Sequence, residues 1–416
     1  MRKRKSLVFG AVLIVALVAV PAMGGCAPEG AAPPAEEKYV TFLSLTDLTG
    51  PIAGFTEPLE EAFSFVFQDV NARGGVDGVK IKQLSVDTRY DIARAMSAYK
   101  RYRHEHKLVM AFVPQTPSTK AMAPLIEKDK LVLTTPADGE FQGRIGRVFL
   151  CAPPYQDGCS ACFDWVVEDW KAKGNAGMPI IGYLSWDSAY GREPLRGGKE
   201  YAEQLGLDLM EPEYFPMGAA DHSVWLQRIA QGGADYCFIG GVDPTPSNIL
   251  RDAYKLGLTE TIQFVDCTYW GPDEALGIRL HPEATEGSVL VSPVLRGDEA
   301  RDHTRVVDLW TKWADEPITE MRALFPAGII VGGDFVHALE LALEDVGYEQ
   351  LDGDAVYEAY QKMTGFSRDG LAGDCTYSPT SRKPSDIVKF YRVENGKTVP
   401  ITDWVKAPDA VALYEW

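Results

Sequence analysis

The feature that most constrains the fold of this chain is an alternation of short apolar runs with longer amphipathic stretches. Apolar runs at 40–45, 79–86 and 108–113 are separated by segments of helical length at 58–72 and 91–106. Strands that are separated by helices are typical of parallel β-α-β units. The sequence therefore predicts an α/β fold built on parallel sheets.

A second series of the same kind begins after Pro153 and Pro154. Its predicted members are helices at 157–173, 190–205, 222–231 and 246–256, which alternate with strands at 179–184, 208–215, 234–241 and 263–266. A chain of 416 residues exceeds one ordinary hydrophobic core, so the two series indicate two α/β domains.

The remainder of the chain is predicted to contain one more strand, three helices and a terminal hairpin. They are a strand at 288–291, helices at 299–314, 328–346 and 354–363, and a hairpin at 386–399. The hairpin turn is Glu394-Asn395-Gly396-Lys397, and Asn-Gly is typical of a two-residue hairpin loop.

Polar loops follow two neighbouring apolar runs, at 108–113 and 131–134. The first loop is 114–119 and the second is 135–139, and both combine hydroxyl side chains with proline. In open α/β sheets, ligands bind in the crevice outside the carboxyl ends of the strands. These loops are therefore expected to border a ligand site, where Ser118 and Thr119 cap the next helix and leave its N–H groups for an anion. The alternative is that these hydroxyls serve only as caps.

The N-terminus reads as an export signal. Basic residues at 2–5 precede an apolar run at 7–20, and small residues then lead to Cys26. This resembles a bacterial lipoprotein signal, which implies cleavage of residues 1–25 and a lipid on the Cys26 thiol; the alternative is a plain secretory signal cut elsewhere. Residues 26–38, rich in Pro, Ala, Gly and Glu, are then expected to form a flexible tether.

The net charge of the chain is strongly negative. Removal of residues 1–25 would take away four positive charges and no negative one, so the net charge of −18 would become −22. Such an acidic protein repels nucleic acid and anionic membrane surfaces, so neither is an expected partner apart from the N-terminal lipid.

Six cysteines remain when Cys26 is assigned to the lipid: Cys151, Cys159, Cys162, Cys237, Cys267 and Cys375. An even number in an exported protein favours disulfides, and the sequence leaves their pairing open. The Cys159 and Cys162 pair could instead serve redox or metal chemistry, but a structural zinc site needs a second pair at metal spacing. Cys237 lies in an apolar run and is expected to be a small buried side chain.

Several short motifs occur in a characteristic order along the chain. They are Thr49-Gly50-Pro51, Asn-Ala-Arg-Gly-Gly-Val-Asp-Gly at 71–78, Asp87, the loop 114–119, Thr135-Pro136-Ala137, Asp-Ser-Ala-Tyr-Gly at 187–191, and Gly240-Gly241. Their order and spacing resemble the type I periplasmic binding proteins, in particular the leucine/isoleucine/valine-binding branch that serves ABC importers. The resemblance extends from residue 39 to about residue 399.

This resemblance implies two Rossmann-like lobes joined by a three-crossing hinge. Lobe one would contain residues 39–152 and 293–385, and lobe two would contain residues 153–292 and the C-terminal hairpin and tail at 386–416. The lobes would close around a small solute, because the ligand touches both of them only in the closed state.

The resemblance also implies roles for particular residues. Thr116 falls where the family places a hydroxyl on the ligand carboxylate, and Ala137 falls where a backbone group contacts the ligand. Phe55 and Tyr190 fall on aromatic side chains that cover the ligand from opposite lobes. For each aromatic residue alone, the alternative is packing in the core.

Three positions depart from the pattern of the amino-acid binders. Gly139 stands where a threonine is usual, Val242 stands where a tyrosine is usual, and Thr268 stands where a carboxylate would bind an ammonium group. Asp266 or Asp243 could replace that carboxylate. A buried ammonium without a partner costs several kcal/mol, which argues against an ordinary branched-chain amino acid as the ligand.

Other polar and aromatic side chains near the predicted site could suit a polar, amide-like, cationic or aromatic solute. They are Gln115, Asp138, Trp186, Asp187, Asp243, Tyr269 and Trp270. The alternative for the three aspartates is turn chemistry.

These observations predict an extracytoplasmic, lipid-anchored solute-binding protein that delivers an amino acid, an amide, a urea-like compound or a carboxylate to ABC permease subunits. A sensory receptor module is the alternative. Enzyme activity is not expected, because the sequence has no Gly-x-Ser-x-Gly, His-Glu-x-x-His or phosphate-binding loop motif, and no cofactor or metal site is indicated.

Overall fold

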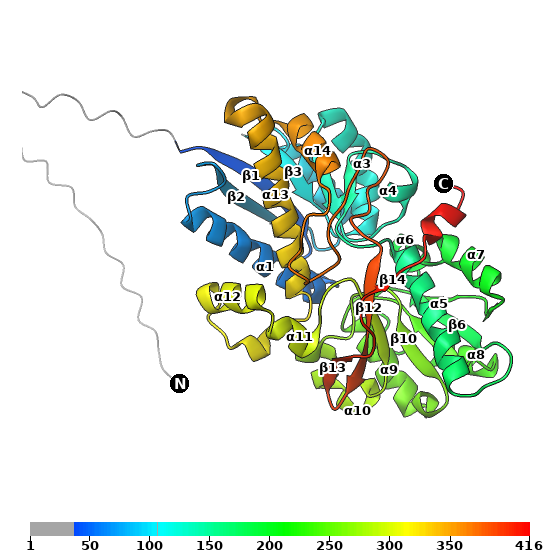
Figure 1. The fold of residues 1–416 in the computed structure, drawn as a ribbon. Helices are drawn as coiled ribbons and strands as arrows, with labels where there is room; N and C mark the ends of the chain where they lie inside the picture. The colour runs from blue at the N-terminus through cyan, green and yellow to red at the C-terminus, as the bar shows by residue number, and fades with distance from the viewer. Residues whose placement is uncertain (1–36, 106) are drawn as a thin grey trace, which may run out of the picture. The chain divides into compact units, whose positions relative to one another are not determined.

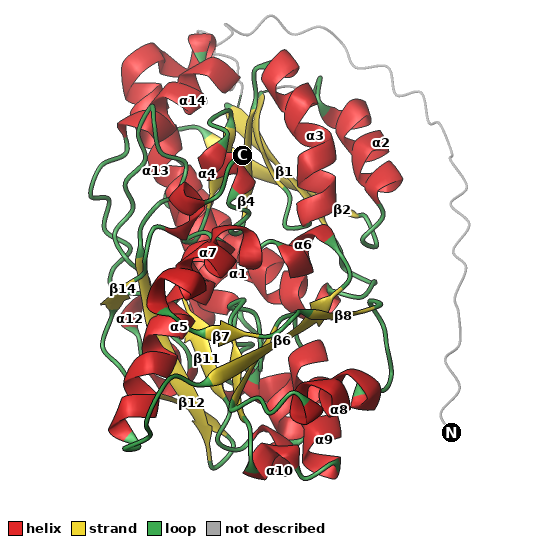
Figure 2. Ribbon diagram, turned by 90° about the vertical axis from the view of Figure 1, so that its right-hand side faces the viewer, coloured by secondary structure: helices red, strands yellow, loops and turns green. Residues whose placement is uncertain are grey.

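The computed structural model describes residues 37–105 and 107–416. The predicted signal at 1–25, the predicted lipidation site Cys26 and the predicted tether as far as residue 36 lie outside the described residues. The described part contains two sheets, each covered by helices (Figures 1 and 2).

The first sheet has five parallel strands in the order β2-β1-β3-β4-β5. The strands are β1 (Tyr39–Thr46), β2 (Lys80–Asp87), β3 (Leu108–Phe112), β4 (Val132–Thr135) and β5 (Val148–Leu150). The helices along this part of the chain are α1 (Ala53–Ala72), α2 (Ile92–Tyr102), α3 (Thr116–Asp129) and α4 (Glu140–Gly143). We call this sheet and its helices the first layer.

Two later helices complete the first layer. The long α13 (Phe325–Gln350) packs beside α1, and α14 (Gly353–Lys362) packs on α13 and on β3 (Figure 1). By length and composition α13 could cross a membrane, but 72% of its most apolar stretch is buried inside the protein. A Cβ atom at Gly328 would lie 2.6 Å from the carbonyl oxygen of Leu59, so only glycine permits this approach of α13 to α1.

The second sheet has the order β13-β12-β11-β10-β9-β6-β7, with β8 paired to β6 and β14 paired to β12. Its parallel strands are β6 (Ile180–Trp186), β7 (Asp208–Leu209), β8 (Glu213–Phe215), β9 (Tyr236–Ile239), β10 (Gln263–Asp266) and β11 (Val289–Ser292). The antiparallel strands are β12 (Ile387–Glu394), β13 (Lys397–Pro400) and β14 (Val405–Lys406). The predicted terminal hairpin is thus β12 and β13.

The helices that belong to this second layer are α5 (Tyr155–Ala172), α6 (Ala189–Arg192), α7 (Leu195–Leu205), α8 (Ser223–Gln231), α9 (Thr245–Lys255) and α10 (Pro282–Thr285). Between the second sheet and α13 the chain forms α11 (Gly297–Arg301) and α12 (Thr304–Trp313). The predicted α/β fold with parallel sheets is confirmed.

Some predicted elements were wrong in detail. The strand β5 was not predicted, because it has only three residues. The helix predicted at 190–205 is two helices, α6 and α7, and Gly197 within the second one has a φ of 96°, which breaks regular helical geometry. The strand predicted at 208–215 is likewise two short strands, β7 and β8, and the helix predicted at 299–314 is interrupted between α11 and α12.

Helix α1 begins earlier than Pro58, where the sequence suggested its start. Pro58 has no N–H group, so it cannot bond to the carbonyl oxygen of Gly54 one turn before it. In the structure, Nη2 of Arg322 donates a hydrogen bond of 2.8 Å to that oxygen. A distant arginine therefore satisfies the carbonyl that proline leaves free, and the helix continues through the proline.

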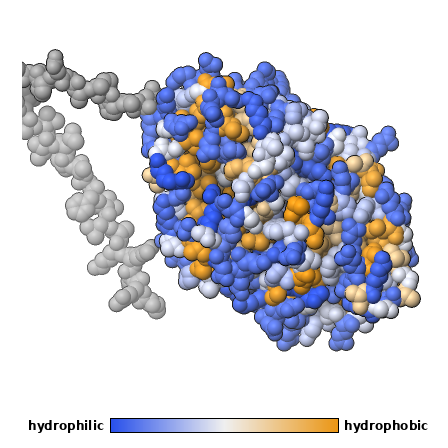
Figure 3. Space-filling model, in the orientation of Figure 1, coloured by the Kyte–Doolittle hydropathy of each residue, from blue (hydrophilic) through white to orange (hydrophobic). Residues whose placement is uncertain are grey.

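The apolar residues divide between a buried core and a polar surface. Aromatic rings fill the space between the first sheet, α1 and α13, where Phe42 packs against Phe63, Phe67 and Phe335. On the face shown in Figure 3, apolar residues form separate patches among hydrophilic ones. The described cysteines contradict the expected disulfides: Cys151, Cys159, Cys162, Cys237, Cys267 and Cys375 are all free thiols. Cys237 is fully buried, as predicted.

Candidate functional site

A small cavity of about 20 Å³ lies where side chains of the two layers meet. It is lined by Ile52, Phe55, Tyr90, Pro114, Thr116, Tyr155, Trp186, Tyr190, Val242 and Trp270. Residues that follow β1, β2 and β3 supply one wall, and residues from β6, α5, α6 and the ends of β9 and β10 supply the other. The cavity therefore lies at the carboxyl ends of strands in both sheets, as the loop chemistry predicted.

Six of the ten lining residues are aromatic, and their rings contact one another. The ring centroids of Tyr155 and Tyr190 are 5.1 Å apart, those of Trp186 and Tyr190 are 5.6 Å apart, and those of Phe55 and Trp270 are 5.1 Å apart. The last pair joins the first layer to the second. None of the ten residues is acidic or basic.

The polar atoms of this cavity are mainly hydrogen-bond donors. Nε1 of Trp270 donates to Oη of Tyr155 at 2.7 Å, and Oη of Tyr190 donates to the carbonyl oxygen of Gly241 at 3.0 Å. The indole N–H of Trp186 is buried and has no acceptor among the described residues. Burial raises the pKa of Tyr90 to about 12 and, with Asp138 and Tyr90 nearby, raises that of Tyr155 well above its usual value, so both hydroxyls keep their protons.

Four of the predicted site residues line the cavity. Phe55 and Thr116 come from the first layer, and Tyr190 and Val242 come from the second. Thr116 is the first residue of α3, the helix that follows β3 in the chain. The sequence missed Tyr90 and Tyr155 as lining residues, although both follow a strand end closely and the strand-end rule could have nominated them.

The other predicted site residues from the first layer lie beside the cavity without lining it. Gln115 is buried, donates to Oγ1 of Thr88 at 2.6 Å and accepts from Oγ of Ser118 at 2.8 Å. The carbonyl oxygen of Ala137 accepts from the backbone N–H of Tyr155 at 2.9 Å. A Cβ atom at Gly139 would lie 2.3 Å from Oε1 of Gln156, so that glutamine occupies the place of a larger side chain.

The predicted site residues Asp266, Thr268 and Asp243 of the second layer form hydrogen bonds within that layer. Oδ1 of Asp266 accepts from the backbone N–H of Thr268 at 2.8 Å, and Oγ1 of Thr268 lies 3.3 Å from the carbonyl oxygen of Gly241. Asp243 accepts from Oγ of Ser247 at 2.6 Å and from the backbone N–H of Gly277 at 2.8 Å. These bonds hold the strand-end loops that carry the cavity wall.

Burial changes the protonation of these two aspartates. Burial raises the pKa of Asp266 to about 7, although its bond with the N–H of Thr268 acts in the opposite direction. Burial and the charge of Asp273 raise the pKa of Asp243 to about 6. Neither carboxyl lines the cavity.

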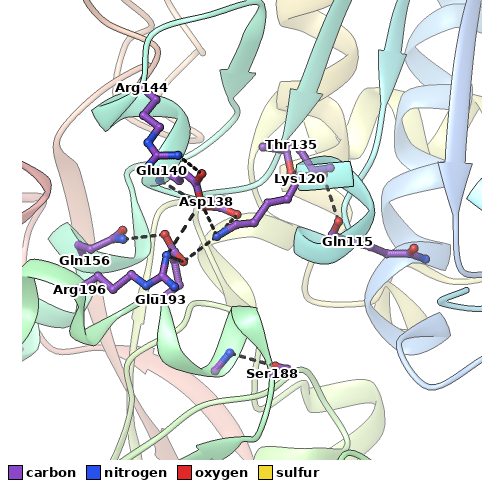
Figure 4. Close-up of polar contacts among 12 residues, drawn as sticks. Gln115, Lys120, Thr135, Asp138, Glu140, Arg144, Gln156, Ser188, Glu193 and Arg196 are labelled. Atoms are coloured by element: carbon purple, nitrogen blue, oxygen red, sulfur yellow. Dashed lines mark hydrogen bonds and ion pairs between the residues drawn. The ribbon is translucent and has the colours of Figure 1, made fainter. Parts of the chain in front are cut away.

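Asp138 belongs to a buried cluster of charged groups beside the cavity (Figure 4). Nζ of Lys120 lies 2.9 Å from Glu140, 3.6 Å from Asp138 and 3.2 Å from Glu193. Nε2 of Gln156 donates to the other oxygen of Glu193 at 3.0 Å. Lys120, Asp138 and Glu140 come from the first layer, whereas Gln156 and Glu193 come from the second, so the cluster joins the two layers.

The charged groups in this cluster shift one another's pKa values. Burial, reinforced by the charge of Glu193, raises the pKa of Asp138 well above its usual value. Burial alone would lower the pKa of Lys120, but the carboxyls of Asp138, Glu193 and Glu140 outweigh it and raise that pKa. The ammonium of Lys120 therefore stays charged among three carboxyl groups.

A second, apolar cavity adjoins the first one. It has a volume of about 20 Å³ and shares Phe55 and Trp270 with the first cavity. Its other lining residues are Leu59, Phe112, Pro136, Cys151, Ala152, Pro293, Val294, Ala327, Ile330 and Val331. The Phe55 and Trp270 rings thus form the partition between a donor-lined cavity and an apolar one.

No group of three or more His, Cys, Asp or Glu side chains within residues 37–105 and 107–416 is placed to hold a metal ion. This includes Cys159 and Cys162, which the sequence left open for redox or metal chemistry.

Comparison with known proteins gives related sequences of low identity. An amino acid binding protein of Pseudomonas aeruginosa is 25% identical over 217 residues, which are 51% of this chain and 56% of that protein. The Leu/Ile/Val-binding protein of Escherichia coli is 22% identical over 338 residues, which are 79% of this chain and 84% of that protein. The match thus spans little more than half of the first relative and most of the second.

Solved structures share the fold at still lower identity. A branched-chain amino acid ABC transporter protein of Thermus thermophilus with bound valine has a TM-score of 0.79 and 20% identity, and the match covers 90% of this chain and 98% of that one. A solute binding protein of an ABC transporter from Rhodopseudomonas palustris, in complex with p-hydroxybenzoic acid, has a TM-score of 0.74 and 17% identity, over 90% and 98% of the two chains.

The family model described as periplasmic binding protein matches residues 40–398, which include all the parallel strands of both sheets, except for the first residue of β1, and the cavity between the layers. This chain belongs to the periplasmic binding protein family.

Proposed function

We propose that this protein is a lipid-anchored, extracytoplasmic solute-binding protein that captures a small solute between two lobes and delivers it to an ABC importer. Lobe one consists of residues 39–152 and 293–385, and lobe two of residues 153–292 and 386–416. The observation that carries the proposal is the aromatic cavity between the layers, whose lining residues come from both of them. Relatives that bind amino acids, valine or p-hydroxybenzoic acid support a small organic solute.

Binding and release follow from the placement of the cavity walls. Phe55 and Thr116 lie on lobe one, and Tyr190 and Val242 lie on lobe two. A solute contacts all four only when the lobes are closed, so it shifts the population toward the closed form. No bond is made or broken, and the closed form is the one that a permease would distinguish from the empty protein.

The cavity can be blocked in a way that tests this proposal. Val242 lines the cavity and is 4% exposed, so Val242→Trp would fill the space with an indole ring. A panel of amino acids, amides, ureas, aromatic acids and short-chain acids is screened for a rise in melting temperature. At least one compound is expected to stabilise the wild type and not Val242→Trp.

The matched control for this variant is Val224→Trp, which makes the same substitution at a side chain that is 57% exposed in α8. It should respond to the ligand as the wild type does. A flat response of the wild type to the whole panel would count against the proposed function.

The anchor is tested separately on the full-length chain. Cys26→Ser removes the thiol that would carry the lipid, so the variant should move from the membrane fraction to the soluble extracytoplasmic fraction. An unchanged membrane fraction would contradict the lipid anchor and leave the solute-binding proposal untouched.

A further inference from the structure

The chemistry of the donor-lined cavity narrows the class of its ligand, and this inference rests on the proposed function. We infer that the ligand is a monocarboxylic acid that has a flat or branched hydrocarbon body and no ammonium group. The inference combines the polar atoms that the cavity offers, the charges that it lacks and the apolar cavity next to it.

Hydroxyl and indole groups of the cavity suit an acceptor such as a carboxylate. The N–H of Trp186, which is 2% exposed, has no acceptor among the described residues. An indole N–H only donates, so an unpaired one in a buried wall calls for a ligand acceptor. Thr116 and Tyr90 also line the cavity, and each carries a hydroxyl that can donate. Thr116 starts the fourteen-residue helix α3, whose free N–H groups add to the same positive potential.

An ammonium group would find no partner in this cavity. None of the ten lining residues is a carboxylate. Of the nearby acids, Asp243 bonds to Ser247 and Gly277, and Asp138, Glu140 and Glu193 surround the ammonium of Lys120. Oδ2 of Asp266 has no hydrogen-bond partner among the described residues, but Asp266 does not line the cavity. A ligand ammonium would therefore lose its water without gaining a counter-charge, which is strongly unfavourable.

The absence of a cationic side chain from the lining also limits which anions the cavity can bind. No Lys, Arg or His lines the cavity, so a phosphate or a sulfate with full charge would lack the basic residues that usually bind it. One carboxylate, whose charge is spread over two oxygens, can be satisfied by hydroxyl and N–H donors alone.

Aromatic and aliphatic side chains offer apolar contacts to the hydrocarbon part of the ligand. Phe55, Tyr155, Tyr190 and Trp270 form the walls of the first cavity, and the apolar second cavity lies behind the pair of Phe55 and Trp270. Aromatic faces favour a flat or hydrocarbon group. The two cavities share Phe55 and Trp270 in their linings, so the hydrocarbon body of the ligand lies next to an apolar space.

Matched pairs of compounds test this class directly by isothermal titration calorimetry. The first pair is 3-phenylpropionate and phenylalanine, and the second is 4-methylpentanoate and leucine; each pair differs only by the α-ammonium group. We expect at least one of the two acids to bind at least 100-fold more tightly than its amino-acid partner. In contrast, 3-phenylpropylamine, which has the same body and a cationic head, should not bind.

A pair of tyrosine variants tests the role of the cavity donors. Tyr90→Phe removes one donor and keeps the ring, and it is expected to weaken binding of the acid about tenfold. Tyr254→Phe removes the same hydroxyl at an exposed position in α9 and should leave the affinity unchanged.

The outcomes separate this inference from the proposed function. If an amino acid binds as tightly as its acid, or if another solute binds while both acids fail, the ligand class is overturned and the proposed function stands. If no compound of the wider panel binds, the proposed function fails as well.

Discussion

The Nζ atom of Lys120 lies 3.2 Å from Oε2 of Glu193, and this ion pair connects the first layer to the second. The Glu193 side chain is fully buried, and the Lys120 side chain is 22% exposed. The partners belong to different layers. If the two lobes open and close as proposed, the pair is expected to form only in the closed state, and its Coulomb energy is then expected to favour closure.

Lys120→Met is expected to favour the open form of the ligand-free protein. The variant removes the cation that pairs with Asp138, Glu140 and Glu193, and loss of these charged bonds should weaken closure by about 1.5–3 kcal/mol. Glu140 keeps its pairs with Arg144 and Arg196, and Glu193 keeps its pair with Arg196. Small-angle X-ray scattering at pH 8 should show a larger radius of gyration than for the wild type.

The control for this variant is Lys130→Met. Lys130 pairs with Asp354 at 2.9 Å within the first layer and is 69% exposed, so the substitution makes the same change of charge without touching the contact between layers. An equal radius of gyration for Lys120→Met and Lys130→Met would show that the Lys120 cluster does not contribute to closure.

Thr116→Val should reduce ligand affinity and leave stability nearly unchanged. The Thr116 hydroxyl lines the cavity, and one lost hydrogen bond to a carboxylate corresponds to about 1.5 kcal/mol, or about tenfold weaker binding. Calorimetric titration with 3-phenylpropionate measures the affinity, and urea unfolding measures the stability.

Thr119→Val provides the contrast, three residues along the same helix. Its hydroxyl donates to the carbonyl oxygens of Val113 and Gln115 at 3.0 Å and 3.1 Å, so its loss should cost about 1–3 kcal/mol of folding free energy. The prediction for Thr116 is wrong if both variants lose stability equally and neither loses affinity.

The stability of the Asp266→Asn variant should increase relative to that of the wild type as the pH rises. Burial raises the pKa of Asp266 to about 7, so in the folded state this carboxyl holds its proton in a range where the unfolded chain releases it. The wild type therefore loses stability between about pH 4 and pH 7 because of this group, by an amount on the order of 4 kcal/mol. Asparagine cannot ionise and escapes this loss.

Urea unfolding of wild type and Asp266→Asn at pH 5 and pH 8 measures this effect. The free energy of unfolding of the variant relative to the wild type should be higher at pH 8 than at pH 5. Asp208→Asn, at an exposed position in β7, is the control and should show the same difference at both pH values. A constant difference for Asp266→Asn would contradict the prediction.

Asp334→Ala should strongly destabilise the protein. Nε of Arg368 donates to Oδ1 of Asp334 at 3.2 Å and Nη2 bonds to the other oxygen, and both side chains are almost fully buried. Removal of Asp334 leaves a buried guanidinium without its counter-charge, which costs about 3–5 kcal/mol. Urea unfolding at neutral pH measures the loss.

The matched control is Asp345→Ala, which breaks the pair of Asp345 with Lys362. Both partners are about half exposed, so the change in stability should be within about 0.5 kcal/mol. Equal losses of stability in the two variants would show that the effect of Asp334→Ala does not come from burial of its ion pair.

The six described cysteines should react as free thiols only after unfolding. Five of them are buried and Cys151 is partly buried, so iodoacetamide should label few of them in the native protein. In denaturant without reductant, peptide mapping by mass spectrometry should find all six alkylated. Peptides joined by a disulfide in the unreduced sample would contradict the structure.

The sequence alone determined the fold class and the edge of the sheets where the site lies. Apolar runs separated by helical segments allow few arrangements other than parallel sheets, and the polar residues at 114–119 marked the end of a strand. Phe55, Thr116, Tyr190 and Val242 were nominated by the resemblance to the periplasmic binding proteins, and all four line one cavity.

Only the tertiary structure decided which neighbouring polar residues face that cavity. Asp138 and Asp243 follow strand ends and Asp266 ends β10, but they contact Lys120, Gly277 and Thr268 and do not line the cavity. The sequence also could not show that Tyr155 and Trp270 meet across 115 residues of chain. Burial and hydrogen-bond geometry depend on contacts between distant segments, and these contacts exist only once both layers have formed.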